Sequence, residues 1–170
     1  MPIAAACAFV KGLLNGLAMP GGLPNMAAYI LPPDPNVEAE IPTAYVWPTE
    51  GDESRAPEKG GTIPRNTGPD TPAGTKSLDH SIDVFCVYFQ ADDDPQADSL
   101  FPGVIDAVMD ALRTSADPAV ITDPSTGDQS QLIDLGERQK YHIVVSALED
   151  QRYNRLDGLI VCPVNEIFHA

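Results

Sequence analysis

The stretch Ile82-Asp83-Val84-Phe85-Cys86-Val87-Tyr88-Phe89 decides the fold class, because apolar side chains occur on both of its alternating faces. A strand whose two faces are both apolar is covered on both sides, which places it inside a sheet and not at its margin. The stretch is also short, eight residues, and rich in β-branched and aromatic residues, which favours a strand over a buried helix. We therefore expect residues 82–89 to form a central strand.

Two helical patterns flank this central strand in the chain. After the acidic turn Asp92 to Pro95, apolar residues recur at helical spacing, with Ser99 as the expected N-cap and Asp98 near the positive end of the helix dipole. This helix is defined by Phe101, Ile105, Val108 and Leu112. Near the start of the chain the same spacing is found in Ile3, Cys7, Val10, Leu14 and Leu17. We expect this first helix to end near Met19, because Pro20-Gly21-Gly22 follows.

The remaining apolar runs predict further strands. They are Met26 to Leu31, Ile41 to Trp47, Val120 to Thr122, a segment that begins at Leu132, Tyr141 to Leu148, and Leu159 to Phe168. Turn-forming residues 123–128 predict a hairpin loop, and the polar link Glu149 to Asp157 joins two strands that we expect to pair antiparallel. The expected fold is α+β: a mixed, mainly antiparallel β-sheet with two helices packed on it, in a single domain over residues 1–170.

The segment Pro48 to Lys76 is rich in proline, glycine, threonine and charged residues and has almost no apolar residue. Such a composition buries too little surface to fold by itself, so the segment is expected to be a long mobile loop. It also holds Arg55, Lys59 and Arg65, a large part of the few basic residues in the chain. With Arg152 and Arg155 of the 149–157 link, these residues are the predicted interface with another protein subunit; for the last two, ordinary solvation is an equal alternative.

The chain carries 25 acidic and 10 basic residues, a formal charge of −15. This charge repels nucleic-acid phosphates and anionic membranes, so sequence-specific DNA binding is not expected. No apolar run approaches the roughly 20 residues that cross a bilayer. The first residues also lack the positive region of a secretory signal, so the expected place of synthesis is the cytoplasm.

No catalytic, cofactor-binding or metal-binding pattern stands out. The odd number of widely spaced cysteines (Cys7, Cys86 and Cys162), flanked by apolar residues, predicts buried free thiols. The histidines (His80, His142 and His169) are expected to be solvated or to cap strand ends, and Asp92 to Asp94 lack the spacing of a calcium loop. Gly21-Gly22 and Gly60-Gly61 do not belong to a phosphate loop, and Ser125 has no nucleophile-elbow motif.

The order of these elements resembles the tail terminator proteins of long-tailed bacteriophages, the siphophage type that includes lambda-like terminators. The resemblance lies in an opening helix, a proline-led strand, a variable loop, a strand followed by an acidic turn and helix, and a final strand. The residues that carry it are Ala4 to Leu17, Ile41-Pro42-Thr43-Ala44-Tyr45-Val46-Trp47, Ile82-Asp83-Val84-Phe85, Phe101-Pro102-Gly103-Val104-Ile105-Asp106, Asp150-Gln151-Arg152 and Val164-Asn165-Glu166-Ile167-Phe168.

This resemblance implies a structural virion protein, not an enzyme. Such a protein forms a homo-oligomeric ring, a hexamer, that caps the tail tube, stops tube polymerisation and presents a surface for head attachment. Its expected partners are its own copies, the major tail tube protein and the head-completion or stopper protein, and DNA passes through the ring without sequence-specific binding. Its expected location is the head-proximal end of the tail, assembled in the host cytoplasm, with no membrane partner. The alternatives are another head-to-tail connector such as a stopper or adaptor, an acidic inhibitor that mimics nucleic acid, and a small hydrolase that uses Ser125 or His142.

Overall fold

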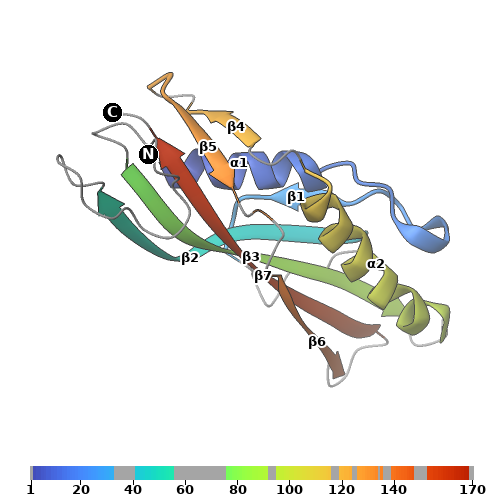
Figure 1. The fold of residues 1–170 in the computed structure, drawn as a ribbon. Helices are drawn as coiled ribbons and strands as arrows, with labels where there is room; N and C mark the ends of the chain where they lie inside the picture. Colours follow the sequence, from blue (N-terminus) through green and yellow to red (C-terminus); the bar gives the residue numbers. More distant parts are fainter. Residues whose placement is uncertain are drawn as a thin grey trace.

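The computed structural model describes residues 2–32, 41–55, 76–91, 95–115, 119–123, 126–133, 135, 139–147 and 153–168. Within these residues the chain forms two α-helices, one short 3-10 helix and seven strands (Figure 1). In chain order the elements are α1 (Pro2–Leu14), η1 (Pro20–Gly22), β1 (Ala27–Tyr29), β2 (Thr43–Arg55), β3 (Lys76–Ala91), α2 (Pro95–Arg113), β4 (Ala119–Thr122), β5 (Gln129–Ile133), β6 (Lys140–Ala147) and β7 (Tyr153–Phe168).

The seven strands form one mixed sheet in the order β1-β2-β3-β7-β5-β4, and β6 also pairs with β7. Only β1 and β2 are parallel; the other pairs are antiparallel. The predicted α+β class is therefore confirmed, as are the hairpin β4–β5 and the antiparallel pairing of β6 with β7.

Strand β3 is the centre of the sheet, as its two apolar faces predicted. It pairs with β2 on one side and along its whole length with β7 on the other, from Lys76 opposite Phe168 to Ala91 opposite Tyr153. The far side of β7 is shared: β6 covers its first half and β5 covers its last residues.

Both helices pack on one face of the sheet, where alternate residues of the strands build the core (Figure 1). This face consists of Ala44 and Val46 of β2, Ile82, Val84 and Cys86 of β3, and Ile160, Cys162 and Val164 of β7. The helices contribute Val10 and Leu14 of α1 and Phe101, Ile105, Val108 and Leu112 of α2, all fully buried. Burial of each large apolar side chain stabilises the fold by roughly 1.5 to 3 kcal/mol.

Helix α1 ends earlier than the sequence predicted, at Leu14 and not near Met19. Gly16 has a φ of 83°, the left-handed conformation that ends a helix, and its N–H donates to the carbonyl of Met26 over 2.8 Å. Leu17 then accepts a hydrogen bond from the N–H of Met26 over 2.9 Å. The chain therefore leaves the helix in order to pair with the residues that lead into β1.

Helix α2 begins earlier than predicted, at Pro95, so Ser99 is not its N-cap and Asp98 lies inside the helix. Proline fits the first helical position, because its fixed φ suits the helix and its missing N–H would have no helical acceptor there. The pattern of apolar residues identified the buried face of this helix correctly, whereas the cap residues did not mark its start.

The predicted loop Pro48 to Lys76 is wrong at both ends. Strand β2 continues through residues 48–55 and pairs with residues 76–82 of β3, with a bulge between Pro48 and Glu50. The expected link between the last two strands is shorter as well, because β7 begins at Tyr153. These polar residues join strands because a neighbouring strand takes up their backbone hydrogen bonds, which requires no apolar pattern of their own. Residues 56–75 lie outside the described part of the chain.

Candidate functional site

Exposed large apolar side chains gather at opposite edges of the sheet. We name the residues near β1 the β1 surface: Tyr29, Ile30, Leu31, Ile41 and Trp47. At the other edge, the β6 surface consists of Tyr141 and Val144 with the exposed Lys140 and His142 beside them. Strands β3 and β7 separate the two surfaces (Figure 1). One further exposed apolar residue, Val120, lies on β4.

On the β1 surface, aromatic residues lie on the sheet face that the helices leave uncovered. Tyr29 is 47% exposed and pairs in register with Tyr45, with 6.1 Å between the ring centroids. Trp47 follows two residues after Tyr45 and therefore lies on the same face, where it is 38% exposed. Tyr45 also belongs to a second apolar cluster, with Val87 and Phe85, which is distinct from the core under the helices.

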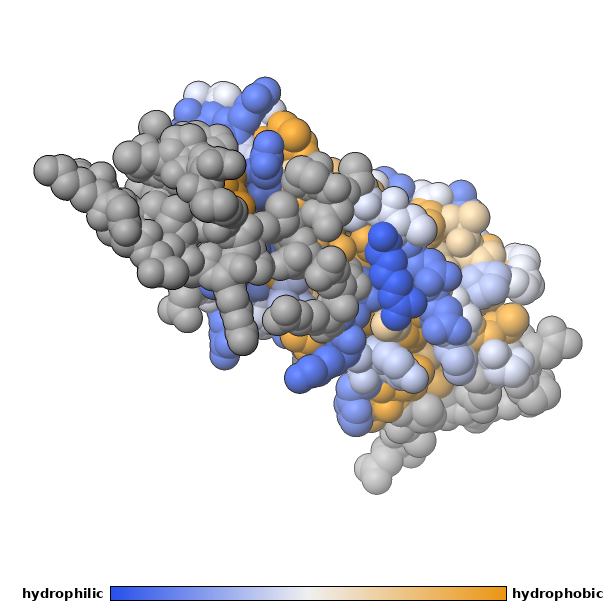
Figure 2. Space-filling view, in the orientation of Figure 1, coloured by the Kyte–Doolittle hydropathy of each residue, from blue (hydrophilic) through white to orange (hydrophobic). Residues whose placement is uncertain are grey.

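On the β6 surface, two apolar side chains occupy opposite faces of a strand at the edge of the sheet. Tyr141 is 60% exposed and Val144 is 42% exposed. Because side chains alternate along a strand, an odd and an even position project to different faces. A partner that approaches this edge therefore meets an apolar side chain above and below the strand. Figure 2 shows hydrophobic surface in separate patches with hydrophilic residues between them.

Charge is distributed unevenly over these two surfaces. No acidic residue occurs in residues 1–33, where Lys11 is the sole charged side chain, and none occurs between Glu137 and Glu149. The β6 surface falls wholly within an acid-free stretch, and so do Tyr29, Ile30 and Leu31 of the β1 surface. In a chain of net charge −15, these stretches are locally free of acidic residues, although Asp157 of the neighbouring strand β7 lies opposite Val144. The gaps between acidic residues are visible in the sequence, but motifs and apolar periodicity do not reveal them.

Between the two surfaces, a buried carboxyl lies on the uncovered face of the sheet. Asp83 is opposite Trp47 in β2 and Val161 in β7. Burial is the main cause that raises the pKa of Asp83; a hydrogen bond with Thr49 lowers it, and the charge of Glu50 raises it further. The single hydroxyl proton of Thr49 is shared with the carbonyl of Ser81, to which the hydroxyl donates over 3.2 Å. The bulge in β2 places Thr49 and Glu50 near this carboxyl.

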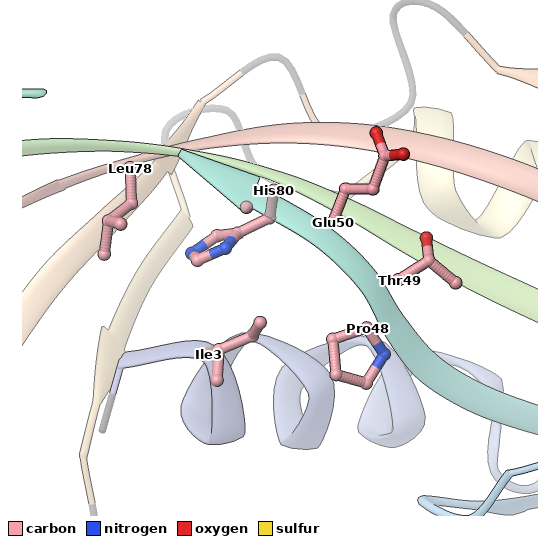
Figure 3. A pocket seen from close by; sticks show the side chains of 7 residues that line it. Ile3, Pro48, Thr49, Glu50, Leu78 and His80 are labelled. Carbon is pink, nitrogen blue, oxygen red and sulfur yellow. The ribbon is translucent and has the colours of Figure 1, made fainter. Parts of the chain in front are cut away.

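A pocket of about 380 Å³ lies between the first turn of α1 and the polar ends of β2 and β3 (Figure 3). It is lined by Ile3, Pro48, Thr49, Glu50, Gly51, Leu78 and His80. His80 is buried, so the expectation that it would be solvated or would cap a strand end is wrong. His80 is buried because it lies on the helix-facing side of β3, two residues before Ile82. The polar residues that surround it in the sequence did not indicate this burial.

This pocket does not assemble an acid and a base. Figure 3 shows the His80 ring directed toward α1 and the Glu50 carboxylate directed away from it. Of the other histidines, His142 is exposed as expected, and His169 lies outside the described residues. In the described ranges, no three His, Cys, Asp or Glu side chains gather to hold a metal ion. The same ranges contain no helix long and apolar enough to span a membrane.

The structure places the two predicted interface residues that it describes, Arg55 and Arg155, far from each other. Arg55 ends β2 opposite Lys76, and Arg155 lies in β7 opposite Phe89; only their backbones are described. Positions 76 and 89 are 13 residues apart along β3, or about 40 Å at roughly 3.3 Å per residue. Lys59, Arg65 and Arg152 lie outside the described residues, as do Ser125, Asp92 to Asp94 and Gly60-Gly61. Arg55 and Arg155 thus cannot belong to one compact patch.

The three cysteines are buried and free, as predicted. Gly21 and Gly22 belong to η1 and have positive φ, but they do not end α1, which stops at Leu14 before Gly16. The sequence matches no model of a known protein family, and a search of curated proteins finds no significant match.

Proposed function

We propose that this chain is a structural assembly protein of the tail terminator type. In this proposal its copies close into a hexameric ring that caps a phage tail tube, stops tube polymerisation and offers an interface for head attachment. The observation that carries the proposal is the occurrence of exposed apolar surfaces at opposite edges of one sheet. Apolar side chains that remain exposed in a group commonly mark places where another protein binds.

The positions of the two surfaces favour a ring over a symmetric dimer. A dimer with twofold symmetry uses the same surface on both copies, whereas a head-to-tail contact uses two different ones and can continue from copy to copy. The β1 surface and the β6 surface differ in composition and lie on opposite sides of β3 and β7. Each copy therefore has one surface for each of two neighbours.

Charge supports the same arrangement. Two copies of a chain with a charge of −15 repel one another unless they meet where acidic residues are absent. Residues 29–31 of the β1 surface and strand β6 itself contain no acidic residue, whereas Asp157 of β7 lies opposite Val144. A ring of six copies would carry six times the charge of one, so that its lumen would repel DNA phosphates and let DNA pass without binding.

The assembly can be tested with two single variants and their mixture. Trp47→Asp disables the β1 surface, and Tyr141→Asp disables the β6 surface; each should prevent rings, which light scattering after gel filtration would measure. A central aromatic contact typically contributes about 2 kcal/mol or more, which is roughly a 30-fold loss of affinity per contact. Val120→Asp on β4 is the matched control and should leave the rings intact.

Mixing the two disabled variants separates head-to-tail assembly from a twofold dimer. In a head-to-tail contact each variant retains one intact surface, so the mixture should form a one-to-one dimer that grows no further. A wild-type protein that stays monomeric at all concentrations would overturn the proposal. Electron microscopy with tail tubes from the same genome provides the second test: wild-type protein should cap tube ends, and tube growth that continues in its presence would contradict a terminator.

A further inference from the structure

The free edge of β1 is closed by the end of helix α1. The backbone hydrogen-bonding groups of successive β1 residues point alternately toward β2 and away from it. The N–H of Ala27 points toward β2 and donates to the carbonyl of Pro42 over 3.0 Å. On the far side, Met26 bonds with Gly16 and Leu17, and the N–H of Ala28 donates to Oδ1 of Asn15 over 3.2 Å. A strand cannot be added to β1 up to this residue, because the donors that it would need are occupied.

The closure ends immediately after Ala28. Strand β1 itself ends at Tyr29, and Ile30 and Leu31 form a bend after it. Tyr29, Ile30 and Leu31 are three consecutive exposed apolar residues, and Pro32 follows with no N–H to donate. Segment 29–31 is thus a short, uncharged and exposed length of chain between a closed edge and a proline.

At the opposite side of the sheet, one edge of β6 has no neighbouring strand among the described residues. All eight residues of β6 pair with β7 on one side, and no strand within the described part of the chain pairs with the other side. Soluble proteins usually protect such an edge with a bulge, a proline, a covering segment or inward-pointing charges. Strand β6 contains no proline, its register with β7 is regular, and Tyr141 and Val144 are exposed on it.

We propose that the β6 edge of one copy receives segment 29–31 of the next copy as an added strand. The inference rests on the ring proposed above and names the contact that joins its subunits. Main-chain hydrogen bonds from Ile30 would supply affinity, and the apolar side chains of the segment would pack on Tyr141 or Val144 of β6. Charge permits the approach, because neither strand contains an acidic residue and Lys140 of β6 attracts the acidic body of the neighbour.

Cysteine cross-linking tests this contact directly. Two double variants, Leu31→Cys/Val144→Cys and Leu31→Cys/Tyr141→Cys, sample the two faces of β6. The native cysteines are buried and should not react. Under mild oxidation one of these variants should form a ladder of covalent oligomers that stops at the ring size. The control Leu31→Cys/Val120→Cys places the second thiol on an exposed residue of β4 and should stay uncross-linked.

The outcomes distinguish this inference from the ring itself. If light scattering detects rings and neither test variant cross-links, the strand addition is wrong and the ring remains. If Val144→Cys or Tyr141→Cys alone cross-links to itself, β6 pairs with β6 and the inference is overturned. If no assembly occurs at any concentration, the proposed function itself is refuted, and the inference that rests on it is refuted as well. Amide exchange provides the backbone test: β6 amides should exchange more slowly in rings than in the Trp47→Asp monomer, and equal rates would refute the strand pairing.

Discussion

Asn165 and Asp79 lie opposite each other in strands β7 and β3, and the side-chain amide of Asn165 donates to Oδ1 of Asp79 over 2.6 Å. Asn165 is buried, whereas Asp79 is exposed. The hydrogen bond joins two residues that are 86 positions apart in the chain, in the polar part of the sheet where few apolar side chains pack. It therefore helps to hold the ends of β3 and β7 in register.

Replacement of Asn165 by alanine should lower the free energy of unfolding by about 1 to 2 kcal/mol, because a hydrogen bond to a charged acceptor is lost. Urea unfolding measures this change. Asp79→Asn is the matched control: it retains an acceptor oxygen and should lose less than half as much. Equal losses in the two variants would show that the charge of Asp79 matters more than the hydrogen bond.

Gly158 allows helix α2 to pack closely on β7. A Cβ atom at this position would collide with Cδ1 of Ile105, and it would also lie 3.4 Å from the ring of Phe101. Gly158→Ala should therefore destabilise the protein by about 1 to 3 kcal/mol. Gly12→Ala is the matched control, since a Cβ there meets nothing within 4 Å and lies in helix α1; it should stabilise the protein by up to about 1 kcal/mol.

A second substitution shows whether this collision is the cause. Ile105→Val removes the Cδ1 atom and alone should lower the free energy of unfolding by about 0.5 to 1.5 kcal/mol. The double variant Gly158→Ala/Ile105→Val should lose less than the sum of the two single losses, because the added methyl group fills the vacated space. Additive losses in urea unfolding would exclude this explanation.

The cysteines should be inert in the folded protein. Burial raises the pKa of Cys7 to about 11 and that of Cys86 to about 12, so at pH 8 roughly one thiol in a thousand or fewer is the reactive thiolate. A thiol reagent such as Ellman's reagent should modify no cysteine of the native protein and three cysteines in urea. Rapid modification of one thiol without urea would reveal local opening of the core.

Local sequence patterns were sufficient to predict the helices and strands that build the core. The two apolar faces of residues 82–89 placed β3 inside the sheet, and the spacing of Phe101, Ile105 and Leu112 identified the buried face of α2. Both predictions rest on apolar side chains, which are more stable when they are buried. Burial is the property that sequence periodicity reports most directly.

The polar ends of β2, β3 and β7 could not be predicted in the same way. Residues 48–55 form a strand because β3 supplies hydrogen-bond partners, and Tyr153 joins β7 because Ala91 lies opposite. Both pairings join segments that are far apart in the chain, so a short stretch of sequence does not contain the information that predicts them. The candidate surfaces were missed for a related reason: an exposed Tyr141 or Tyr29 has the composition of a core residue, and its exposure depends on where the sheet ends.

Asp83 should make the stability of the protein depend on pH. Its pKa in the folded protein is raised by burial, in part offset by the hydrogen bond with Thr49. The folded state therefore favours the protonated carboxyl, and this contribution to stability is complete below the pKa of the unfolded chain. As the pH rises through the folded pKa, the carboxyl loses its proton and the contribution is lost. At neutral pH the buried charge thus lowers the free energy of unfolding.

Asp83→Asn should consequently be more stable than the wild type at pH 7, with a gain that disappears at about pH 3, below the ordinary pKa of an aspartate. Asparagine retains an oxygen that can accept from Thr49, so the comparison isolates the charge. Urea unfolding of both proteins at pH 3, 5 and 7 measures the difference. Glu50→Gln removes the nearby charge that also raises the pKa of Asp83, and it should produce a smaller gain in the same direction. If Asp83→Asn is less stable than the wild type at pH 7, the Asp83 carboxylate stabilises the sheet through its charge, contrary to the desolvation argument.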